Sequence, residues 1–402
     1  MSKIFENYTG DVTLELKKLA ERPRILDQLE EVVQGQGFAG SADIPKLVYL
    51  VLLTGVFDRP SSLLIKGPSG AGKSYSLNMG RQFVPETAYE QFEGMTEKSL
   101  IYHTDLDLRN KHVIIGEAAG SADGNGNAFL RQLLSEGQIR YSTTQSTNEG
   151  LKGVTIEVEG PTGLIMTTTA GRIHAEDESR MISVSVTESP DQIRAALLAQ
   201  AVGSQAPVEE INLQPWHDLY EVYRSAPKEV IIPYAGKIAE ALPTSHDRIK
   251  RDFPQVLNLI TAHALLHSCS RERTGNGVLI ATRDDYDVVY GLVNDALSEG
   301  LEVTVSEPVR QVVEAVKDLA QKPSTSITVS QAEIVQHLGR DRAVISRNVG
   351  RAIELGYLTD ETPGQGRTSS LRLGEVELPS NKVLPLPEEL FAEEATSVPE
   401  MV

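Results

Sequence analysis

Eight consecutive residues have the types and the spacing needed to bind a triphosphate. They are Gly67-Pro68-Ser69-Gly70-Ala71-Gly72-Lys73-Ser74, which fits the pattern Gly-x4-Gly-Lys-Ser. Glycines let backbone N–H groups wrap around a phosphate, and the amino end of a following helix adds a partial positive charge. Lys73 would reach the β- and γ-phosphates, and Ser74 would ligate Mg²⁺. This segment therefore predicts a site for ATP and Mg²⁺.

The segments on either side of this loop have the character that it requires. The apolar run Leu63-Leu64-Ile65 predicts a buried strand before it, and Tyr75-Ser76-Leu77-Asn78-Met79 has helical spacing after it. A glycine turn beside a surface lysine is the alternative interpretation of the same residues. The strand and the helix favour the phosphate-binding loop.

A second candidate for the site is an acidic residue that follows an apolar strand farther along the chain. The run His112-Val113-Ile114-Ile115-Gly116-Glu117 ends in a carboxylate, where P-loop ATPases place their water-activating group. Glu117 is the candidate base. Gly116 occupies the position of the usual aspartate, so metal ligation would depend on Ser74, the phosphates and water. A surface glutamate at a strand end would give the same pattern.

Two further positions could act on the γ-phosphate. The predicted strand 163–169 ends in three hydroxyls, and we assign the sensing role to the last of them, Thr169. Arg180 precedes the predicted strand Ile182-Ser183-Val184, and from the far end of the sheet it could not fold back onto its own nucleotide. An arginine in that place predicts a ring in which each site is completed by a neighbouring subunit. A surface salt bridge to one of the acids 176–178 is the alternative.

Between the glutamate strand and the sensor strand we expect a helix over 128–136 and then a β-hairpin. Residues 138–144 and 154–159 both alternate in polarity, with a polar turn between them. Lys152 lies near the expected tip and Arg140 at the base, where they could contact single-stranded DNA. A plain hairpin with solvated charges is the alternative.

In this order the pieces resemble the AAA+ ATPases of the minichromosome-maintenance (MCM) type, in the short form found on phages, plasmids and genomic islands. The resemblance runs from about Ile44 to about Leu297. The family's sensor asparagine falls on Thr169, and its Ser-Arg-Phe-Asp motif falls on Ser179-Arg180-Met181-Ile182. The resemblance implies that Arg251 is the lid arginine, with Arg248 as the alternative. It also implies a hexameric ring and a helicase that serves the replication of a mobile element.

The C-terminal part predicts a winged helix-turn-helix. Two helices, 329–339 and 340–355, precede two short strands that bracket a glycine-rich turn. The second helix would present Arg342, Arg347 and Arg351, and the turn adds Arg367. Such side chains meet phosphates and base edges, which makes double-stranded DNA a second candidate ligand. Use of this domain for protein contact is the alternative.

Composition limits the remaining possibilities. The chain has 402 residues and a formal charge of −18, so any DNA contact must be local. We expect a cytoplasmic protein, because no apolar run approaches the roughly 20 residues of a membrane span and the first residues lack a signal peptide's apolar core. The predicted domains are N-terminal helices (1–44), an α/β AAA+ P-loop core with a parallel sheet (45–202), a helical lid (203–321), the winged helix (322–378) and a disordered acidic tail (379–402).

These observations predict an ATP-dependent motor that assembles into a homo-oligomeric, hexamer-like ring and moves single-stranded DNA. One alternative is an AAA+ initiator, loader or remodeller that binds duplex DNA without processive unwinding. The other is a nucleotide-gated scaffold with negligible hydrolysis.

Overall fold

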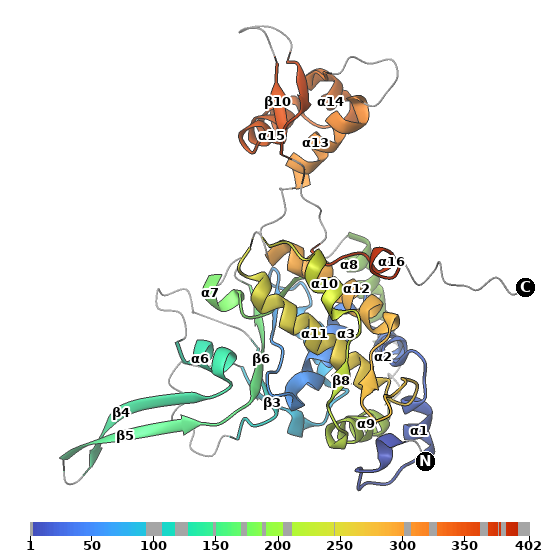
Figure 1. The fold of residues 1–402 in the computed structure, drawn as a ribbon, viewed down its shortest axis with the longest axis vertical. Coiled ribbons are helices and arrows are strands. Elements are labelled where there is room, and N and C mark those ends of the chain that lie inside the picture. Colours follow the sequence, from blue (N-terminus) through green and yellow to red (C-terminus); the bar gives the residue numbers. More distant parts are fainter. Residues whose placement is uncertain are drawn as a thin grey trace, which may run out of the picture. The chain divides into compact units, whose positions relative to one another are not determined.

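The chain forms two compact units, which are seen in the computed structural model (Figure 1). One is drawn from residues 1–300 and 384–402, and the other from residues 301–383. Within the residues described below, no helix combines the length and apolar character that a membrane crossing would require. The structure describes residues 3–93, 107–116, 128–147, 150–169, 175–186, 190–203, 211–244, 246–300, 307–320, 328–361, 369–376, 378 and 383–392.

A five-stranded parallel sheet lies at the centre of the larger unit. Its strand order is β2-β3-β6-β1-β7, and each neighbouring pair is parallel. Strand β6 is buried along its whole length, as expected where both faces of a parallel sheet are covered. The α/β class and the parallel sheet predicted from the sequence are confirmed. The strands are β1 (Leu63–Lys66), β2 (Tyr89–Phe92), β3 (Lys111–Ile115), β6 (Thr162–Thr168) and β7 (Ile182–Ser185).

The register of these strands defines two edges that matter for the site. Leu63 of β1 lies opposite Ile182 of β7, and Lys66 lies opposite Thr168 of β6. Because the strands are parallel, all their carboxyl ends lie on one side of the sheet, which we call the carboxyl edge. Their first residues lie on the opposite side, which we call the amino edge. Segments that follow the strands therefore meet at the carboxyl edge.

Helix α3 (Asp43–Leu53) is the most buried helix of the larger unit's N-terminal part. Each residue from Leu47 to Leu53 is at most 1% exposed. A sequence that is apolar on all sides buries all sides of its helix. It packs against α4 (Lys73–Arg81), which begins directly after the glycine-rich loop. The other N-terminal elements are η1 (Lys3–Phe5), α1 (Leu14–Ala20), α2 (Ile25–Gly35), η2 (Thr54–Val56) and η3 (Glu86–Ala88).

The predicted hairpin is present between β3 and β6. Strands β4 (Ile139–Thr147) and β5 (Gly150–Val158) are antiparallel, and α6 (Ala128–Glu136) precedes them. Ile139 and Val158 pair at the base and are buried in a cluster with β-sheet residues and Leu133 of α6. The rest of the hairpin extends away from the sheet (Figure 1). The apolar base thus fixes the direction of a long polar arm.

The described residues that follow the sheet are mainly helical and include one short strand pair. Trp216, buried in α9, packs its ring against Tyr49 of α3 and Phe83, at centroid distances of 5.7 and 4.6 Å. These aromatic contacts attach the helices to the sheet unit. The elements are α8 (Pro190–Gly203), α9 (Gln214–Ser225), α10 (Ala235–Ala241), α11 (Ile249–Leu266) and α12 (Arg283–Gly300), with β8 (Val230–Ile231) paired to β9 (Leu279–Ile280). A further short helix, α7 (Ala175–Glu178), lies between β6 and β7.

Residues 384–392 return to the larger unit as a strap that contains α16 (Pro387–Leu390). The hydroxyl of Tyr286 in α12 donates to the carbonyl of Pro385 at 2.7 Å, and Phe391 packs on Tyr234 at 5.1 Å. The sequence predicted disorder from 379 onward, and the strap corrects that prediction. Its apolar side chains Leu384, Leu390 and Phe391 are buried, which offsets the entropy of ordering.

In its described residues, the smaller unit has three helices and a two-stranded antiparallel sheet around its own core. Its helix α14 begins with a capping box in which Ser330 and Glu333 exchange hydrogen bonds. Helix α13 contributes Val309, Val312 and Val316 to this core, so the domain boundary predicted at residue 322 moves to residue 301. The elements are α13 (Glu307–Ala320), α14 (Gln331–Leu338), α15 (Arg342–Glu354), β10 (Leu358–Asp360) and β11 (Leu371–Leu373).

The strap should contribute measurably to the stability of the larger unit. We expect Phe391→Ala to lower the free energy of unfolding by about 3 kcal/mol, since it empties an aromatic contact with Tyr234 and Tyr286. Denaturant unfolding followed by tryptophan fluorescence measures this. The matched control is Glu388→Ala, an exposed position of the same strap. Equal midpoints for Phe391→Ala and wild type would show that the strap adds no stability.

Candidate functional site

The glycine-rich loop 67–74 joins the carboxyl end of β1 to the start of α4. Gly70 and Gly72 have φ angles of +85° and +77°, a conformation that favours glycine. Lys73 begins the helix, and its Nζ donates to the carbonyls of Gly67 and Pro68 at 2.9 and 2.8 Å. The ammonium group therefore lies along the loop, where a phosphate could replace these carbonyl contacts.

A pocket of about 320 Å³ opens beside the loop at the carboxyl edge. Lys73, Ser74 and Thr169 all line it, so three of the residues predicted from the sequence come together here. Thr167 and Gly116 complete its far wall, and the Thr167 hydroxyl donates to the Gly116 carbonyl. The pocket offers one cation and several hydroxyls to an anionic ligand.

A larger cavity of about 940 Å³ adjoins the other side of the loop and shares Gly70, Gly72 and Tyr75 with the first pocket. Its walls include Phe38, whose ring stacks on Tyr75 with centroids 5.6 Å apart, and side chains of α8 and α12. Ile193 and Leu197 of α8 are 45% and 61% exposed and face this space as apolar lining. The size and mixed lining fit a small organic ligand whose phosphates lie on the loop.

The residues near the loop suit a hard divalent cation. Mg²⁺ prefers oxygen ligands and keeps several waters, and the hydroxyls of Ser74, Thr167 and Thr169 line the same pocket. Ser74 is the second residue of α4, as its predicted role requires. Glu117, the predicted base, lies outside the described residues. Gly116 brings no side chain to the pocket.

Arg180 lies at the other edge of the sheet. It precedes Ile182, which is opposite Leu63 at the start of β1, whereas the loop follows Lys66 at the end of β1. Four residues of strand separate the two by roughly 13 Å. The Arg180 side chain donates to Ser135 Oγ at 2.8 Å and pairs with Glu176 at 3.3 Å. Within one chain, therefore, Arg180 makes the salt bridge that was the alternative prediction, and it is not brought to the loop.

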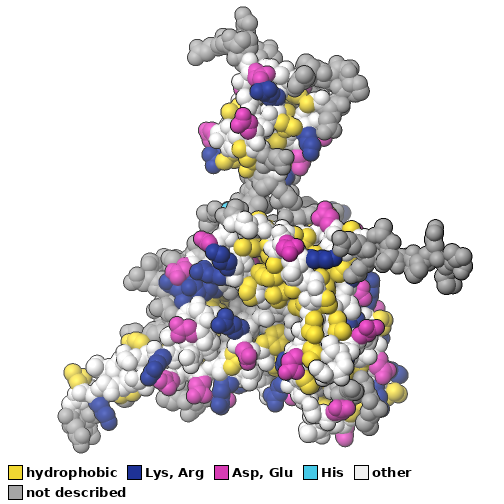
Figure 2. Space-filling view, in the orientation of Figure 1, with side chains coloured by type: hydrophobic (Ala, Val, Ile, Leu, Met, Phe, Trp, Pro, Cys, Tyr) yellow, Lys and Arg dark blue, Asp and Glu magenta, His cyan; other side chains and the backbone are white. Residues whose placement is uncertain are grey.

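Arg251 and Arg248 differ in how they are held. Arg251 of α11 donates to Ser179 Oγ at 2.6 Å, which places it beside Arg180 at the amino edge. Arg248 pairs at 3.1 Å with Asp252, whose side chain is fully buried, and contacts the Met181 carbonyl. Arg248 is thus part of the packing, and Arg251 is the one at the surface. Figure 2 shows Lys and Arg side chains gathered over α7 and the adjoining end of α11.

The hairpin presents its two predicted DNA contacts unequally. Arg140 pairs with Glu157 on the opposite strand at 2.9 Å, so its charge is compensated. Lys152 is exposed near the tip, and its neighbour Leu151 is 79% exposed. An apolar side chain beside a cation at the end of an arm is suited to contact a partner, because neither group is needed for folding the base.

In the smaller unit, α15 carries the predicted arginines on its exposed side. Arg342, Arg347 and Arg351 are all exposed, and Arg351 pairs with Glu354 at 2.9 Å. Ile345 and Val349 of the same helix are buried in the unit's core, which fixes the helix face that remains outside. Arg367 lies outside the described residues.

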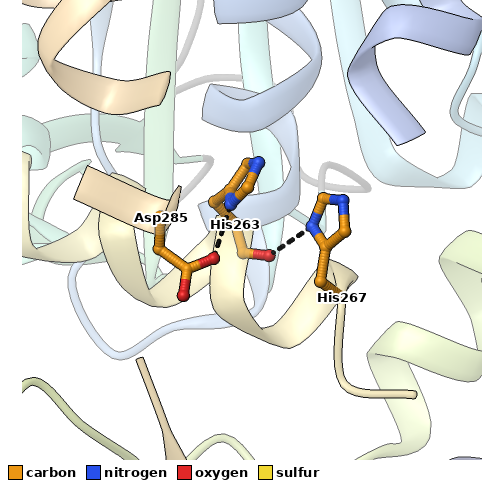
Figure 3. A group of neighbouring side chains, drawn as sticks. All are labelled: His263, His267 and Asp285. Carbon is orange, nitrogen blue, oxygen red and sulfur yellow. Dashed lines mark hydrogen bonds and ion pairs between the residues drawn. The ribbon is translucent and has the colours of Figure 1, made fainter. Parts of the chain in front are cut away.

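Three buried side chains at the junction of α11 and α12 could be mistaken for a metal centre (Figure 3). The ligand atoms of His263, His267 and Asp285 lie within 4.8 Å of one another. His263 Nδ1 contacts Asp285 Oδ1 at 2.6 Å, and His267 Nδ1 donates to the His263 carbonyl at 3.0 Å.

The bonds around this cluster favour a structural role. The second nitrogen of His267 accepts the N–H of Ile25 at 3.2 Å, which occupies the lone pair that a metal would need. Asp285 also accepts from Arg271 at 2.7 Å, so a cation already neutralises it. Burial opposes its ionisation, but hydrogen bonds from His263 and Arg271 outweigh this and hold the pKa of Asp285 below its ordinary value. The network ties α2 to α11 and α12.

Several residues of the site were not found from the sequence. Phe38 lies between Gly37 and Gly40, both with positive φ, so a glycine pair around an aromatic residue was the available signal. Tyr75 follows the loop directly, but its helical spacing did not show that it faces Phe38. No sequence signal marked the apolar side of α8, whose role at the cavity follows only from its exposure in the fold.

Comparison with known proteins adds no assignment. No protein-family model matches the chain, and a search of the curated proteins finds no match.

Acid should destabilise the protein through His267. Burial lowers the pKa of His267 from 6.5 to about 3, so the unfolded chain binds a proton between these values and the folded chain does not. Stability is therefore lost as the pH falls below about 6.5. Between pH 7 and pH 5 we expect wild type to lose about 2 kcal/mol more than His267→Gln, which can keep both hydrogen bonds without titrating. Denaturant titrations at both pH values measure this, and parallel pH profiles would contradict it.

Proposed function

We propose that this chain is an ATP-hydrolysing AAA+ motor of the MCM-like type. The observation that carries the proposal is the position of the loop 67–74, which lies at the carboxyl edge of the sheet with Lys73, Ser74 and Thr169 around one pocket. The order β2-β3-β6-β1-β7 supports the same conclusion, because the strand that precedes the loop lies between β6, which Thr169 directly follows, and β7. ATP with Mg²⁺ is the ligand that this chemistry favours.

The nucleoside part of ATP would occupy the larger cavity. Gly70 and Gly72 border both spaces, so a ligand can run from one to the other along the loop. Tyr75 with Phe38 and the apolar residues of α8 would contact the base, and Asp295 and Glu299 of α12 offer acceptors to ribose hydroxyls.

The placement of Arg180 supports a ring. A guanidinium at the amino edge cannot act on the phosphates of its own loop, but a neighbouring copy could receive it. To reach a neighbouring copy, the Arg180 side chain would have to exchange its contacts with Glu176 and Ser135 for the phosphates. In this proposal each ATP lies between two copies, one with the loop and the other with Arg180 and Arg251.

The hairpin would carry the substrate contact. Its base is fixed in the core and its tip presents Lys152 and Leu151, which suits the movement of single-stranded DNA along a channel. A second candidate function is an initiator or remodeller on duplex DNA, which the exposed Arg342 and Arg347 of α15 favour.

Hydrolysis should need two complementary copies. Lys73→Ala should abolish ATP binding, and Arg180→Ala should bind ATP but hydrolyse it about 10³-fold more slowly. Mixed in equal amounts, the two inactive variants should regain hydrolysis, because about a quarter of randomly formed interfaces combine an intact loop with an intact arginine. Phosphate release measures this, with unfolding temperatures as the control for folding. A mixture no more active than its components would refute a shared site.

DNA should stimulate hydrolysis through the hairpin tip. Lys152→Ala should weaken single-stranded DNA binding and reduce the salt slope of log K by about 0.7, while Arg140→Ala, already paired with Glu157, should have a smaller effect. Fluorescence anisotropy over a salt series tests this, with the rate of hydrolysis recorded in parallel. Unchanged binding in Lys152→Ala, together with a loss of duplex binding in Arg347→Ala, would favour the initiator.

A further inference from the structure

Gly116 lies at the carboxyl edge beside the phosphate pocket and brings no side chain to it. It follows β3, and its main chain lines the pocket together with Lys73 and Ser74. A side chain at this position would begin at the wall of this pocket, with atoms of Glu93 as its nearest neighbours. Glycine supplies none, so a carboxylate for the cation has to come from another element.

Glu93 reaches this space from the neighbouring strand. It follows β2, and the pairing of the two strands continues beyond their ends because the N–H of Gly116 donates to the Phe92 carbonyl at 2.9 Å. A Cβ added at Gly116 would lie 3.2 Å from Glu93 Oε2. The Glu93 carboxylate thus lies where a side chain at position 116 would begin. Its other oxygen is 3.4 Å from the Gln91 side-chain amide, which leaves Oε2 as the oxygen facing Gly116.

Glu93 is also singled out by its place in the sheet. The described residues that come directly after the five strands are Gly67, Glu93, Gly116, Thr169 and Val186, and among these Glu93 alone carries a carboxylate. Neighbouring strands are about 4.8 Å apart, a distance that a glutamate side chain can span. Its exposure keeps it free to move when a ligand arrives.

We infer that Glu93 is the carboxylate that orients the hydrated divalent cation of the bound nucleotide, in place of a side chain at Gly116. The inference rests on the proposed function and specifies the cation site within it. Mg²⁺ and Mn²⁺ retain waters in such sites, so Glu93 would act by accepting hydrogen bonds from those waters. Glu93 is a positioning residue here, because it holds the cation against the phosphates and does not touch the reacting atoms.

The test measures how much a cation strengthens nucleotide binding. A fluorescent, non-hydrolysable ATP analogue is titrated into the full-length protein with Mn²⁺ and, separately, with EDTA. Glu93→Gln should reduce the gain from Mn²⁺ by about tenfold and leave the affinity in EDTA unchanged. Glu86→Gln, an exposed carboxylate before the other end of β2, is the matched control and should behave as wild type. The electron paramagnetic resonance signal of bound Mn²⁺ gives an independent readout.

Moving the carboxylate from position 93 to position 116 makes the test stricter. Adding Gly116→Asp to Glu93→Gln returns a carboxylate to the same space, and it should restore the gain from Mn²⁺. If wild type binds the analogue and Mn²⁺ strengthens binding to Glu93→Gln as much as to wild type, this inference is overturned and the proposed function still stands. If wild type binds the analogue with neither Mn²⁺ nor EDTA, the proposed function is overturned, and this inference with it.

Discussion

The parallel register of the central sheet is the constraint on which the proposed chemistry depends. It collects the loop 67–74, Gly116, Glu93 and Thr169 at the carboxyl edge, and Arg180 with Arg251 at the amino edge. The strand between these groups is too long for an arginine to cross. In the proposed function, one chain therefore carries both halves of a phosphate site but cannot join them. A sheet of mixed direction would not impose this separation.

Helix α12 connects the candidate nucleotide site to the rest of the larger unit. Asp295 and Glu299 line the larger cavity, while Asp285 at its start belongs to the buried network with His263 and Arg271. Tyr286 and Asn294 of the same helix hold the strap that follows the smaller unit. The chain leaves the larger unit at the end of α12 and returns to it beside Asn294.

Short sequence patterns predicted the loop and the hairpin, the two features that depend on residues close together in the chain. The glycine spacing and the apolar run before it predicted the loop, and alternation on both arms predicted the hairpin, because these features depend on neighbouring residues. The prediction of a disordered tail was wrong for residues 383–392. Pro and Glu dominate the composition of the tail, and only the tertiary contacts of Phe391 with Tyr234 and Tyr286 show why it is ordered. The domain boundary predicted near residue 322 was wrong for a similar reason, because the apolar face of α13 does not indicate in which core the helix packs. Glu93 carried no signal, because its role depends on which strand lies beside β3.

An electron-microscopy reconstruction of the protein with a non-hydrolysable ATP analogue and single-stranded DNA would show whether two copies share each nucleotide. We expect a ring in which the Arg180 guanidinium of one copy lies within hydrogen-bonding distance of the γ-phosphate held by the loop of the next, with its contact to Glu176 broken. A nucleotide bound on the loop while Arg180 remains paired with Glu176, and with no second copy beside the phosphates, would contradict it.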